Sequence, residues 1–256
     1  MAEPRIAIDH VSKSYGAHRA LDDVSLTVAA GEFVALVGAS GSGKTTLLKT
    51  INRLISPDAG TVRIEGEDAG AQPPHLLRRR IGYVFQDIGL FPHLTVAENI
   101  AVTPKLLGWD KPRLAARVDE LLDLVALPRD WGARFPAALS GGQRQRIGVA
   151  RALAAQPHIV LMDEPFGALD PLTRDALGED YRALHERLGL STVMVTHDMT
   201  EALLLADRIA VLAGGRLIAE GPPQALARSD DPQVADLLAA PRRQAARLAE
   251  RLGGAA

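Results

Sequence analysis

The amino-acid sequence predicts an α/β fold with an N-terminal antiparallel β-region and a helical subdomain inserted into the core. Apolar runs at residues 33–37, 81–85 and 159–162 are typical of buried core strands. Apolar residues spaced two apart between residues 6 and 28 indicate antiparallel strands. Between residues 87 and 139 the strand pattern disappears, and apolar side chains recur at helical spacing. The expected parts are a core at residues 1–86 and 140–222, a helical subdomain at 87–139 and a short C-terminal helical tail at 223–256.

The composition is ordinary for a soluble protein and argues against several functional classes. Of the 256 residues 47% are hydrophobic and 23% charged, and the net charge of −2 argues against a general nucleic-acid binder, which would show a basic excess. No apolar run approaches the ~18 residues that a membrane-spanning helix needs, and residues 1–5 do not resemble a signal peptide. Without cysteine there is no disulfide framework and no cysteine-based zinc site. We expect a cytoplasmic chain that only a partner holds at a membrane.

Residues 38–46, between an expected strand and an expected helix at 45–54, carry the strongest local signal. They contain two glycines five residues apart followed by Lys-Thr, which is the phosphate-loop pattern. In such a turn the glycines let the backbone approach a triphosphate, and the helix N-terminus adds partial positive charge. Lys44 would neutralise the β- and γ-phosphates, and the Thr45 hydroxyl would coordinate Mg²⁺. An ordinary Gly/Ser turn is the weaker alternative, so we predict a nucleoside triphosphate site. Its residues are Gly38, Ala39, Ser40, Gly41, Ser42, Gly43, Lys44, Thr45 and Thr46.

Two carboxylates follow the expected strand at residues 159–162. Asp163 is placed to hold Mg²⁺, directly or through water, and Glu164 to orient the attacking water. Pro165 is expected to keep Glu164 extended, since a residue before proline avoids the helical region. Together with the phosphate loop, this acidic pair indicates a metal-assisted phosphate site.

Gln86 and His197 follow two further core strands. Because ligands bind at the carboxyl ends of parallel strands, Gln86 is placed to reach a γ-phosphate or its Mg²⁺. His197 has two interpretations: a structural histidine bonded to Asp198, or a phosphate contact, which its position beside the other polar strand ends favours. Tyr15 also has two: a surface aromatic in a turn, or a stacking platform for a nucleotide base.

Residues 139–143 read LSGGQ and precede an expected helix at 144–155. Ser140 is a natural N-cap, and Gly141 and Gly142 would expose N–H groups at the positive end of the helix. The segment is therefore either a simple capped helix start or a second anion cradle. The apolar run at 88–94 is typical of a surface that faces a partner. Residues 241–256 are expected to form a frayed helix or a mobile tail.

This set of motifs resembles the ATP-binding cassette (ABC) ATPase family. The motifs occur in the order that is typical of that family: the phosphate loop at 38–46, Gln86, the LSGGQ signature at 139–143, the strand and acidic pair at 159–165, the turn at 168–170 and His197. The resemblance covers residues 5–222. LSGGQ between the two nucleotide motifs is highly specific, whereas the phosphate loop alone is not.

The resemblance implies a P-loop NTPase fold that binds ATP and Mg²⁺ and works as a homodimer of cassettes. Each ATP would lie between the phosphate loop of one subunit and the signature residues Ser140, Gly141, Gly142 and Gln143 of the other. Tyr15 would stack on adenine, Glu164 would be the general base, and His197 would contact the γ-phosphate. Thr45, Gln86 and Asp163 would serve the metal, and Asp170 would lie at the dimer contact.

Three stretches resemble importer ATPases for osmoprotectants such as glycine betaine and choline: residues 51–55, 88–93 and 103–109. This implies integral permease subunits, a separate solute-binding protein and a place at the cytoplasmic face of the membrane, with no nucleic acid. The alternatives are an importer ATPase for another small solute such as an amino acid, an exporter ATPase, and a soluble cassette protein. Regulatory CBS domains, which follow the cassette in some relatives, are not expected in these 256 residues.

Overall fold

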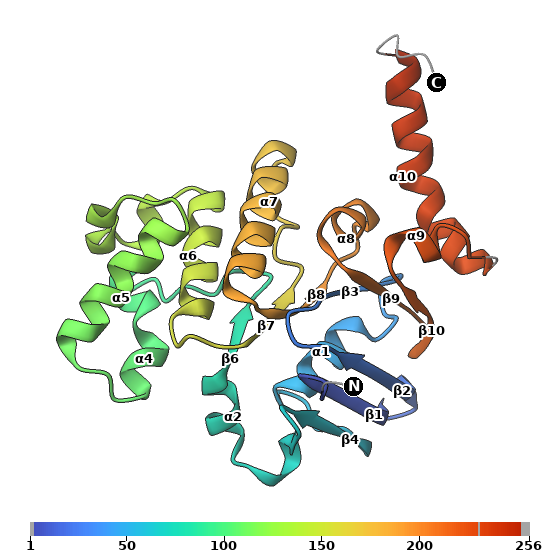
Figure 1. The fold of residues 1–256 in the computed structure, drawn as a ribbon, viewed down its shortest axis with the longest axis horizontal. Helices are drawn as coiled ribbons and strands as arrows, with labels where there is room; N and C mark the ends of the chain where they lie inside the picture. Colours follow the sequence, from blue (N-terminus) through green and yellow to red (C-terminus); the bar gives the residue numbers. More distant parts are fainter. Residues whose placement is uncertain (1–2, 230, 252–256) are drawn as a thin grey trace.

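Two β-sheets and a group of helices make up the structure, a computed structural model that describes residues 3–229 and 231–251 (Figure 1). The larger sheet has the strand order β10-β9-β3-β8-β7-β6, and its β9 to β6 neighbours pair in parallel. Its strands are β3 (Phe33–Val37), β6 (Ile81–Val84), β7 (Ile159–Asp163), β8 (Ser191–Val195), β9 (Arg208–Ala213) and β10 (Arg216–Gly221). The predicted parallel core is confirmed, and β10 pairs with β9 as an antiparallel edge strand.

The predicted N-terminal antiparallel region is also confirmed as a second sheet, with the order β2-β1-β4-β5. Its strands are β1 (Ile6–Tyr15), β2 (His18–Val28), β4 (Ala59–Ile64) and β5 (Glu67–Asp68). β1 and β2 form a hairpin in which Tyr15 pairs with His18, and β4 joins the other side of β1. Alternating residues such as Ile6 and Ile8 are buried, because one face of this sheet packs on the core.

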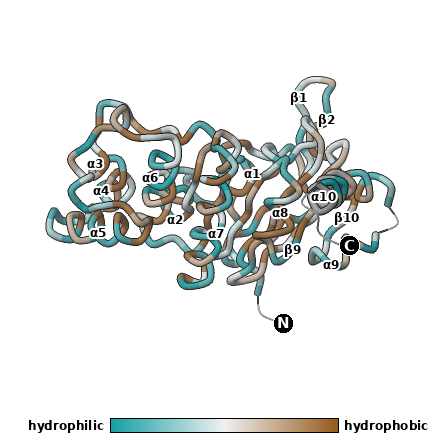
Figure 2. The backbone as a smooth tube through the Cα atoms, turned by 90° about the horizontal axis from the view of Figure 1, so that it is seen from above, coloured by the Kyte–Doolittle hydropathy of each residue, from teal (hydrophilic) through white to brown (hydrophobic). Residues whose placement is uncertain are grey.

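The central strand β3 separates two hydrophobic clusters. Phe33, Ala35 and Val37 belong to the cluster shared with α6, α7 and α8, whereas Val34 and Leu36 belong to the cluster between the sheets and α1. In Figure 2 the neighbouring strand β9, beside α8, is coloured as hydrophobic. The helices around the sheets are α1 (Lys44–Ile51), α2 (Pro74–Arg80), α7 (Pro171–Leu188) and α8 (Met199–Leu205), with the short η1 (Ala69–Ala71) before α2. Because successive side chains of β3 enter one cluster and then the other, this strand is apolar at every position.

Helices occupy the far end of the molecule from the antiparallel sheet (Figure 1). They are α3 (Val96–Ile100), α4 (Val102–Leu106), α5 (Lys111–Leu124), η2 (Arg129–Ala133), η3 (Pro136–Ala138) and α6 (Gly141–Leu153). On α5 the predicted apolar face is buried at Val118, Leu121 and Leu122. α6 contacts α3 and α5 as well as β6, so the helical unit continues past residue 139, and the boundary between the parts stays a proposal.

The C-terminal tail forms α9 (Pro223–Leu226) and α10 (Pro232–Arg251), which contains Pro241. α10 packs on α8 near its start, where Val234 and Leu238 are buried, and its later turns project from the body (Figure 1). Residues 241–251 are thus helical, and residues 252–256 of the expected tail lie outside the described residues. Among the described helices, none combines the length and the apolar character that crossing a membrane requires.

Two helix boundaries differ from the expectation. The helix after the phosphate loop ends at Ile51 rather than at residue 54, because the Asn52 side chain accepts a hydrogen bond from the Leu54 N–H at 3.1 Å and turns the chain. The helix after the signature begins at Gly141 rather than at residue 144. Both glycines of the signature therefore lie in the first helical turn.

Candidate nucleotide-binding site

The phosphate loop joins β3 to α1 and requires glycine at two positions. Gly38 has φ 144°, and a Cβ atom there would stand 2.1 Å from the Leu212 carbonyl oxygen. Gly43 has φ 103°, and a Cβ atom there would stand 2.4 Å from the Ala20 carbonyl oxygen. Any side chain at either position would collide with backbone and would strain the left-handed φ. The loop is thus wedged between β9 and β2.

Lys44, the first residue of α1, is folded over this loop. Its Nζ donates hydrogen bonds to the carbonyl oxygens of Gly38 and Ala39, each at 2.8 Å, and only 6% of the residue is exposed. Burial lowers the pKa of Lys44, and the nearby carboxylates of Glu164 and Asp163 act in the opposite direction. The loop therefore encloses a largely desolvated ammonium group, which interacts strongly with an anion.

Thr45 and Asp163 lie together as predicted. The Thr45 hydroxyl donates to Asp163 Oδ1 at 3.0 Å, and Asp163 Oδ2 lies 3.4 Å from the Tyr83 hydroxyl and 3.8 Å from Lys49 Nζ. Hydroxyl and carboxylate oxygens suit Mg²⁺, which proteins hold through one or two such groups together with substrate phosphates. Residues 3–229 and 231–251 hold no group of three or more His, Cys, Asp or Glu side chains suited to a metal. The donor set fits Mg²⁺.

Glu164, Gln86 and His197 meet at the adjoining corner. Glu164 Oε2 accepts from Gln86 Nε2 at 3.4 Å and lies 3.2 Å from His197 Nδ1. The predicted metal contact of Gln86 stays a prediction, since its side chain points to Glu164 instead. His197 bonds to Glu164, while Asp198 caps α8 by accepting from the Thr200 N–H at 2.8 Å, and the phosphate contact of His197 stays a prediction.

The expectation that Glu164 is extended is wrong. Its φ is 46°, in the left-handed region, although Pro165 follows it. Proline favours extended backbone in the residue before it, but the Glu164 N–H donates to the Val195 carbonyl at 2.9 Å, and this bond to β8 holds the left-handed conformation. Strained backbone of this kind gathers at functional sites. Here it turns the Glu164 carboxylate toward Gln86 and His197.

A cleft of about 420 Å³ brings together six of the nine phosphate-loop residues with Tyr15, Glu164 and His197, whereas Gln86 and Asp163 are not among the residues that line it. It is lined by Tyr15, His18, Ala20, Ser40, Gly41, Gly43, Lys44, Thr45, Thr46, Glu164 and His197. Tyr15 is 48% exposed at the end of β1, which suits a ring that stacks on a base. His18 and Ala20 were not predicted, and no local motif marks them. They reach the cleft only because β2 pairs with β1 beside Tyr15.

The signature segment lies outside this cleft. Ser140 N-caps α6 in a capping box: its N–H donates to Gln143 Oε1 at 2.8 Å, and its Oγ accepts from the Gln143 N–H at 3.3 Å. Beside it, Asp170 N-caps α7 by accepting from the Thr173 N–H at 3.0 Å, and hydrogen bonds from Thr173 lower the pKa of this carboxyl. A Cβ atom on Gly142 would stand 2.6 Å from Thr173 Cγ2. The signature and Asp170 therefore form a second exposed surface, separate from the cleft.

Comparison with known proteins agrees with this geometry. The sequence model of the ABC transporter family matches residues 21–167. The choline transport ATP-binding protein OpuBA of Bacillus subtilis is 51% identical over 88% of this chain, which spans 59% of the length of that relative. The glycine betaine uptake system ATP-binding protein YehX of Escherichia coli is 50% identical over 85% of this chain and 71% of its own length. The sulfate/thiosulfate import protein CysA of Caulobacter vibrioides is 49% identical over 90% of this chain and 68% of its own length.

Solved structures agree as well. The cassette MJ0796, in a dimeric post-hydrolysis state bound to ADP and Pi, has a TM-score of 0.77 and 34% identity over 85% of this chain and 98% of its own. The cassette cbiO1 of Clostridium perfringens has a TM-score of 0.81 and 25% identity over 89% of this chain and 92% of its own. With the phosphate loop, the acidic strand end and the separate signature on one fold, the chain belongs to the ABC transporter family and has the α/β fold of its ATPase cassettes.

Proposed function

We propose that the chain is the ATP-binding and ATP-hydrolysing subunit of a membrane importer for an osmoprotectant of the quaternary-amine class. The observation that carries the proposal is the cleft in which Lys44, Thr45 and Glu164 converge, beside a signature segment that lies outside it. The names of OpuBA and YehX, both transport ATP-binding proteins at about half identity, support the same class.

In the proposed reaction Glu164 is the general base. Its carboxylate opens on the cleft and is held by His197 and Gln86, so it is oriented to take a proton from a water that attacks the γ-phosphate. Lys44 stabilises the negative charge that develops on the phosphate oxygens. Mg²⁺ held at Thr45 and Asp163 would neutralise further phosphate charge. His197 is placed to contact the γ-phosphate.

The separation of the two anion cradles supports a homodimer. The N-terminus of α6 carries free N–H groups and partial positive charge at Gly141 and Gly142, but no residue of 139–143 lines the cleft of its own chain. A second copy in head-to-tail orientation would bring its Ser140 to the open cleft. ATP would then be enclosed only between two copies, with Asp170 at the contact.

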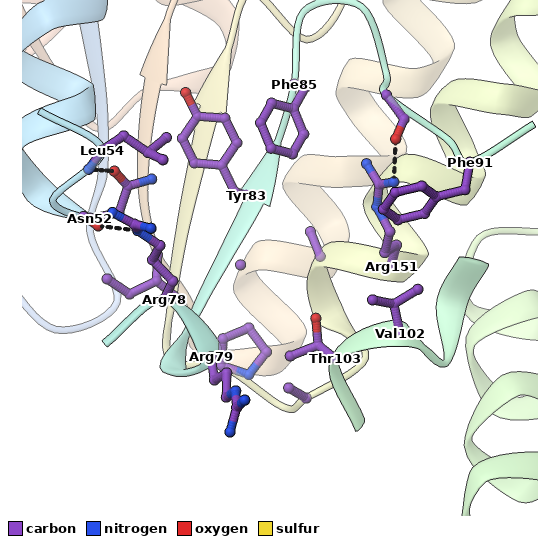
Figure 3. Close-up of a pocket in the computed structure, with 16 residues that line it drawn as sticks. Asn52, Leu54, Arg78, Arg79, Tyr83, Phe85, Phe91, Val102, Thr103 and Arg151 are labelled. Atoms are coloured by element: carbon purple, nitrogen blue, oxygen red, sulfur yellow. Dashed lines mark hydrogen bonds between the residues drawn. The ribbon is translucent and has the colours of Figure 1, made fainter. Parts of the chain in front are cut away.

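A second groove, of about 360 Å³, is the proposed docking site for the permease (Figure 3). All three stretches that resemble osmoprotectant ATPases contribute to it: Leu54 from residues 51–55, Phe91 from 88–93 and Thr103 from 103–109. Residues 51–55 are more than thirty positions from the other two stretches in the sequence, so their convergence on one surface, outside the nucleotide cleft, supports a shared partner. The exposed aromatic ring of Phe91, 43% exposed, agrees with the partner-facing role predicted for residues 88–94.

The groove also has a definite charge. Figure 3 shows Arg78 and Arg79 along one side and Arg151 on the other, around the rings of Tyr83 and Phe85. No carboxylate is among the described residues that line it. Such a groove fits the carboxyl end of a helix or a helix with an acidic side chain, because both present negative charge to the arginines. The permease helix would dock there and hold the chain at the cytoplasmic face of the membrane.

Import of sulfate or a related anion is the second candidate, because CysA is almost as similar in sequence. The solute would be recognised by the permease and a separate solute-binding protein, so the residues of the nucleotide cleft do not discriminate between a quaternary amine and sulfate. The test is uptake by vesicles that contain this chain, with its co-purified membrane subunits and binding protein. ATP-dependent uptake of labelled choline or glycine betaine supports the proposal, uptake of sulfate alone supports the alternative, and purification without any membrane subunit contradicts both.

A further inference from the structure

The loop that follows Gln86 is fastened to α6 by Arg151. The guanidinium group of Arg151 donates to the carbonyl oxygens of Ile88 and Gly89, each at 2.6 Å, and lies 5.8 Å from the centre of the Phe85 ring. Figure 3 shows this side chain at the wall of the groove, with a dashed bond to the loop. Arg151 is only 9% exposed, and it makes no ion pair within residues 3–229 and 231–251. A buried cation that is satisfied by carbonyl groups alone is costly to maintain.

The loop is held in an unfavourable backbone conformation. Ile88 has φ 60° and Gly89 has φ 58°. For a β-branched residue a positive φ is a clear outlier, and here it directs the two successive carbonyl groups at one guanidinium. The Ile88 side chain also packs on α6, since a Cβ atom on Gly148 would stand 3.3 Å from Ile88 Cγ2. Gly148 and Arg151 are three residues apart and share one face of the helix.

The two ends of this connection belong to different functional surfaces. Before the loop, Gln86 contacts Glu164 in the cleft, whereas Phe85 and Gly89 line the docking groove. At the other end of α6, Gly141 lies ten residues before Arg151, and Ser140 of the signature caps the helix. A helix of this length moves as a rigid body. A displacement of the loop that is transmitted to Arg151 therefore also displaces the signature at the N-terminus of α6.

We propose that Arg151 is a positioning residue that couples the loop after Gln86 to the signature helix, so that this loop and α6 move as one body when nucleotide binds. The inference rests on the proposed function and adds a residue outside the cleft and the signature. Without Arg151 the loop loses its hydrogen bonds to α6, so it no longer follows the movement of the signature helix when nucleotide binds.

The absence of cysteine from the sequence makes a direct measurement possible. Nitroxide labels on Thr61→Cys, in β4 of the antiparallel sheet, and on His93→Cys, in the loop after Gln86, report the distance between that sheet and the loop by pulsed electron paramagnetic resonance. Labelled chain is diluted with unlabelled chain so that distances within one subunit dominate. The spectra are recorded without nucleotide and with Mg²⁺ and a non-hydrolysable ATP analogue, and gel filtration on the same samples reports dimer formation.

With Arg151 present, the analogue is expected to shift the distance distribution. In Arg151→Met the shift is expected to disappear while nucleotide still binds, and Arg151→Lys, which keeps the charge but cannot span both carbonyls, is expected to restore part of it. If Arg151→Met does not fold, the lysine variant decides, and a full shift there overturns the proposal. A full shift in Arg151→Met, or no shift with Arg151 present in dimeric protein, also overturns it.

Arg117→Met is the matched control. Arg117 likewise donates to two carbonyl oxygens, of Leu153 at 2.7 Å and Ala154 at 3.2 Å, and fastens α5 to the end of α6 rather than the loop. The shift is expected to survive in this variant, and its loss to the same extent as in Arg151→Met would remove the special role of Arg151. A chain that binds no nucleotide and forms no dimer contradicts the proposed function itself, which separates that failure from a failure of this inference.

Discussion

Alanine at position 82 is expected to force β6 away from α6. A Cβ atom on Gly82 would stand 2.6 Å from the Ala152 carbonyl oxygen and 3.2 Å from Pro157 Cγ. Carbon and carbonyl oxygen approach to about 3.3 Å at the closest in weak C–H···O contacts, so strand and helix must separate by roughly 0.7 Å. Overpacking of this kind costs about 1–3 kcal/mol. For a domain of this size the melting temperature should fall by roughly 2–12 °C, at about 2–4 °C per kcal/mol.

Calorimetry or circular dichroism of Gly82→Ala measures this directly, with Gly132→Ala as the matched control. Gly132 is buried as well, but a Cβ atom there meets its nearest neighbours at 3.6 and 3.8 Å, which is ordinary contact. Nucleotide affinity, measured with a fluorescent ATP analogue, should persist in the folded variant because the phosphate loop lies on β3 and α1. A melting temperature of Gly82→Ala within 1 °C of the parent protein, or a larger drop in Gly132→Ala, would refute the close approach.

Three other predictions concern the reaction, the dimer and the pH dependence of stability. Glu164→Gln should slow single-turnover phosphate release by about 10²–10⁴-fold and leave ATP binding intact; a rate within twofold of the parent would remove its role as base. Ser140→Arg should abolish the Mg-ATP-dependent dimer in gel filtration while the monomer still binds ATP, and a normal dimer would contradict the arrangement in trans. Burial lowers the pKa of His185, which lies 3.0 Å from Thr192 Oγ1, so the folded state favours the neutral ring and stability falls as pH drops through about 6.5. His185→Gln should therefore lose less thermal stability between pH 7.5 and 5.5, and an equal loss in thermal melts would count against this assignment.

The parts of the site that the sequence predicted depend on short-range chemistry. Gly38 and Gly43 are fixed by their φ angles, Ser140 by the orphan N–H groups of the helix that it caps, and Asp163 by its place at the end of a buried strand. Each of these motifs can be recognised within a few residues of the chain, although the carbonyl groups that crowd Gly38 and Gly43 belong to distant strands. The fold class followed for the same reason, since strand and helix patterns repeat locally.

What could not be predicted depends on pairing between distant segments. In the sequence nothing distinguishes Arg151 from the other basic residues of its helix, and only the tertiary structure shows that it donates hydrogen bonds to the Ile88 and Gly89 carbonyl groups. The positive φ of Glu164 comes from its bond to Val195 on a neighbouring strand and overrides the preference that Pro165 imposes. His18 enters the cleft through strand pairing, which no motif encodes.

The position of β6 at the margin of the sheet has a mechanical consequence. β3, which carries the phosphate loop, is flanked by β8 and β9, whereas among the described strands the four residues of β6 pair only with β7. A small displacement of the chain leading to Gln86 therefore disturbs one row of inter-strand bonds instead of two. If the permease docks in the groove as proposed, a displacement there can move β6 while β3 and the phosphate loop stay in place, because the two strands occupy an outer and an inner position of one sheet.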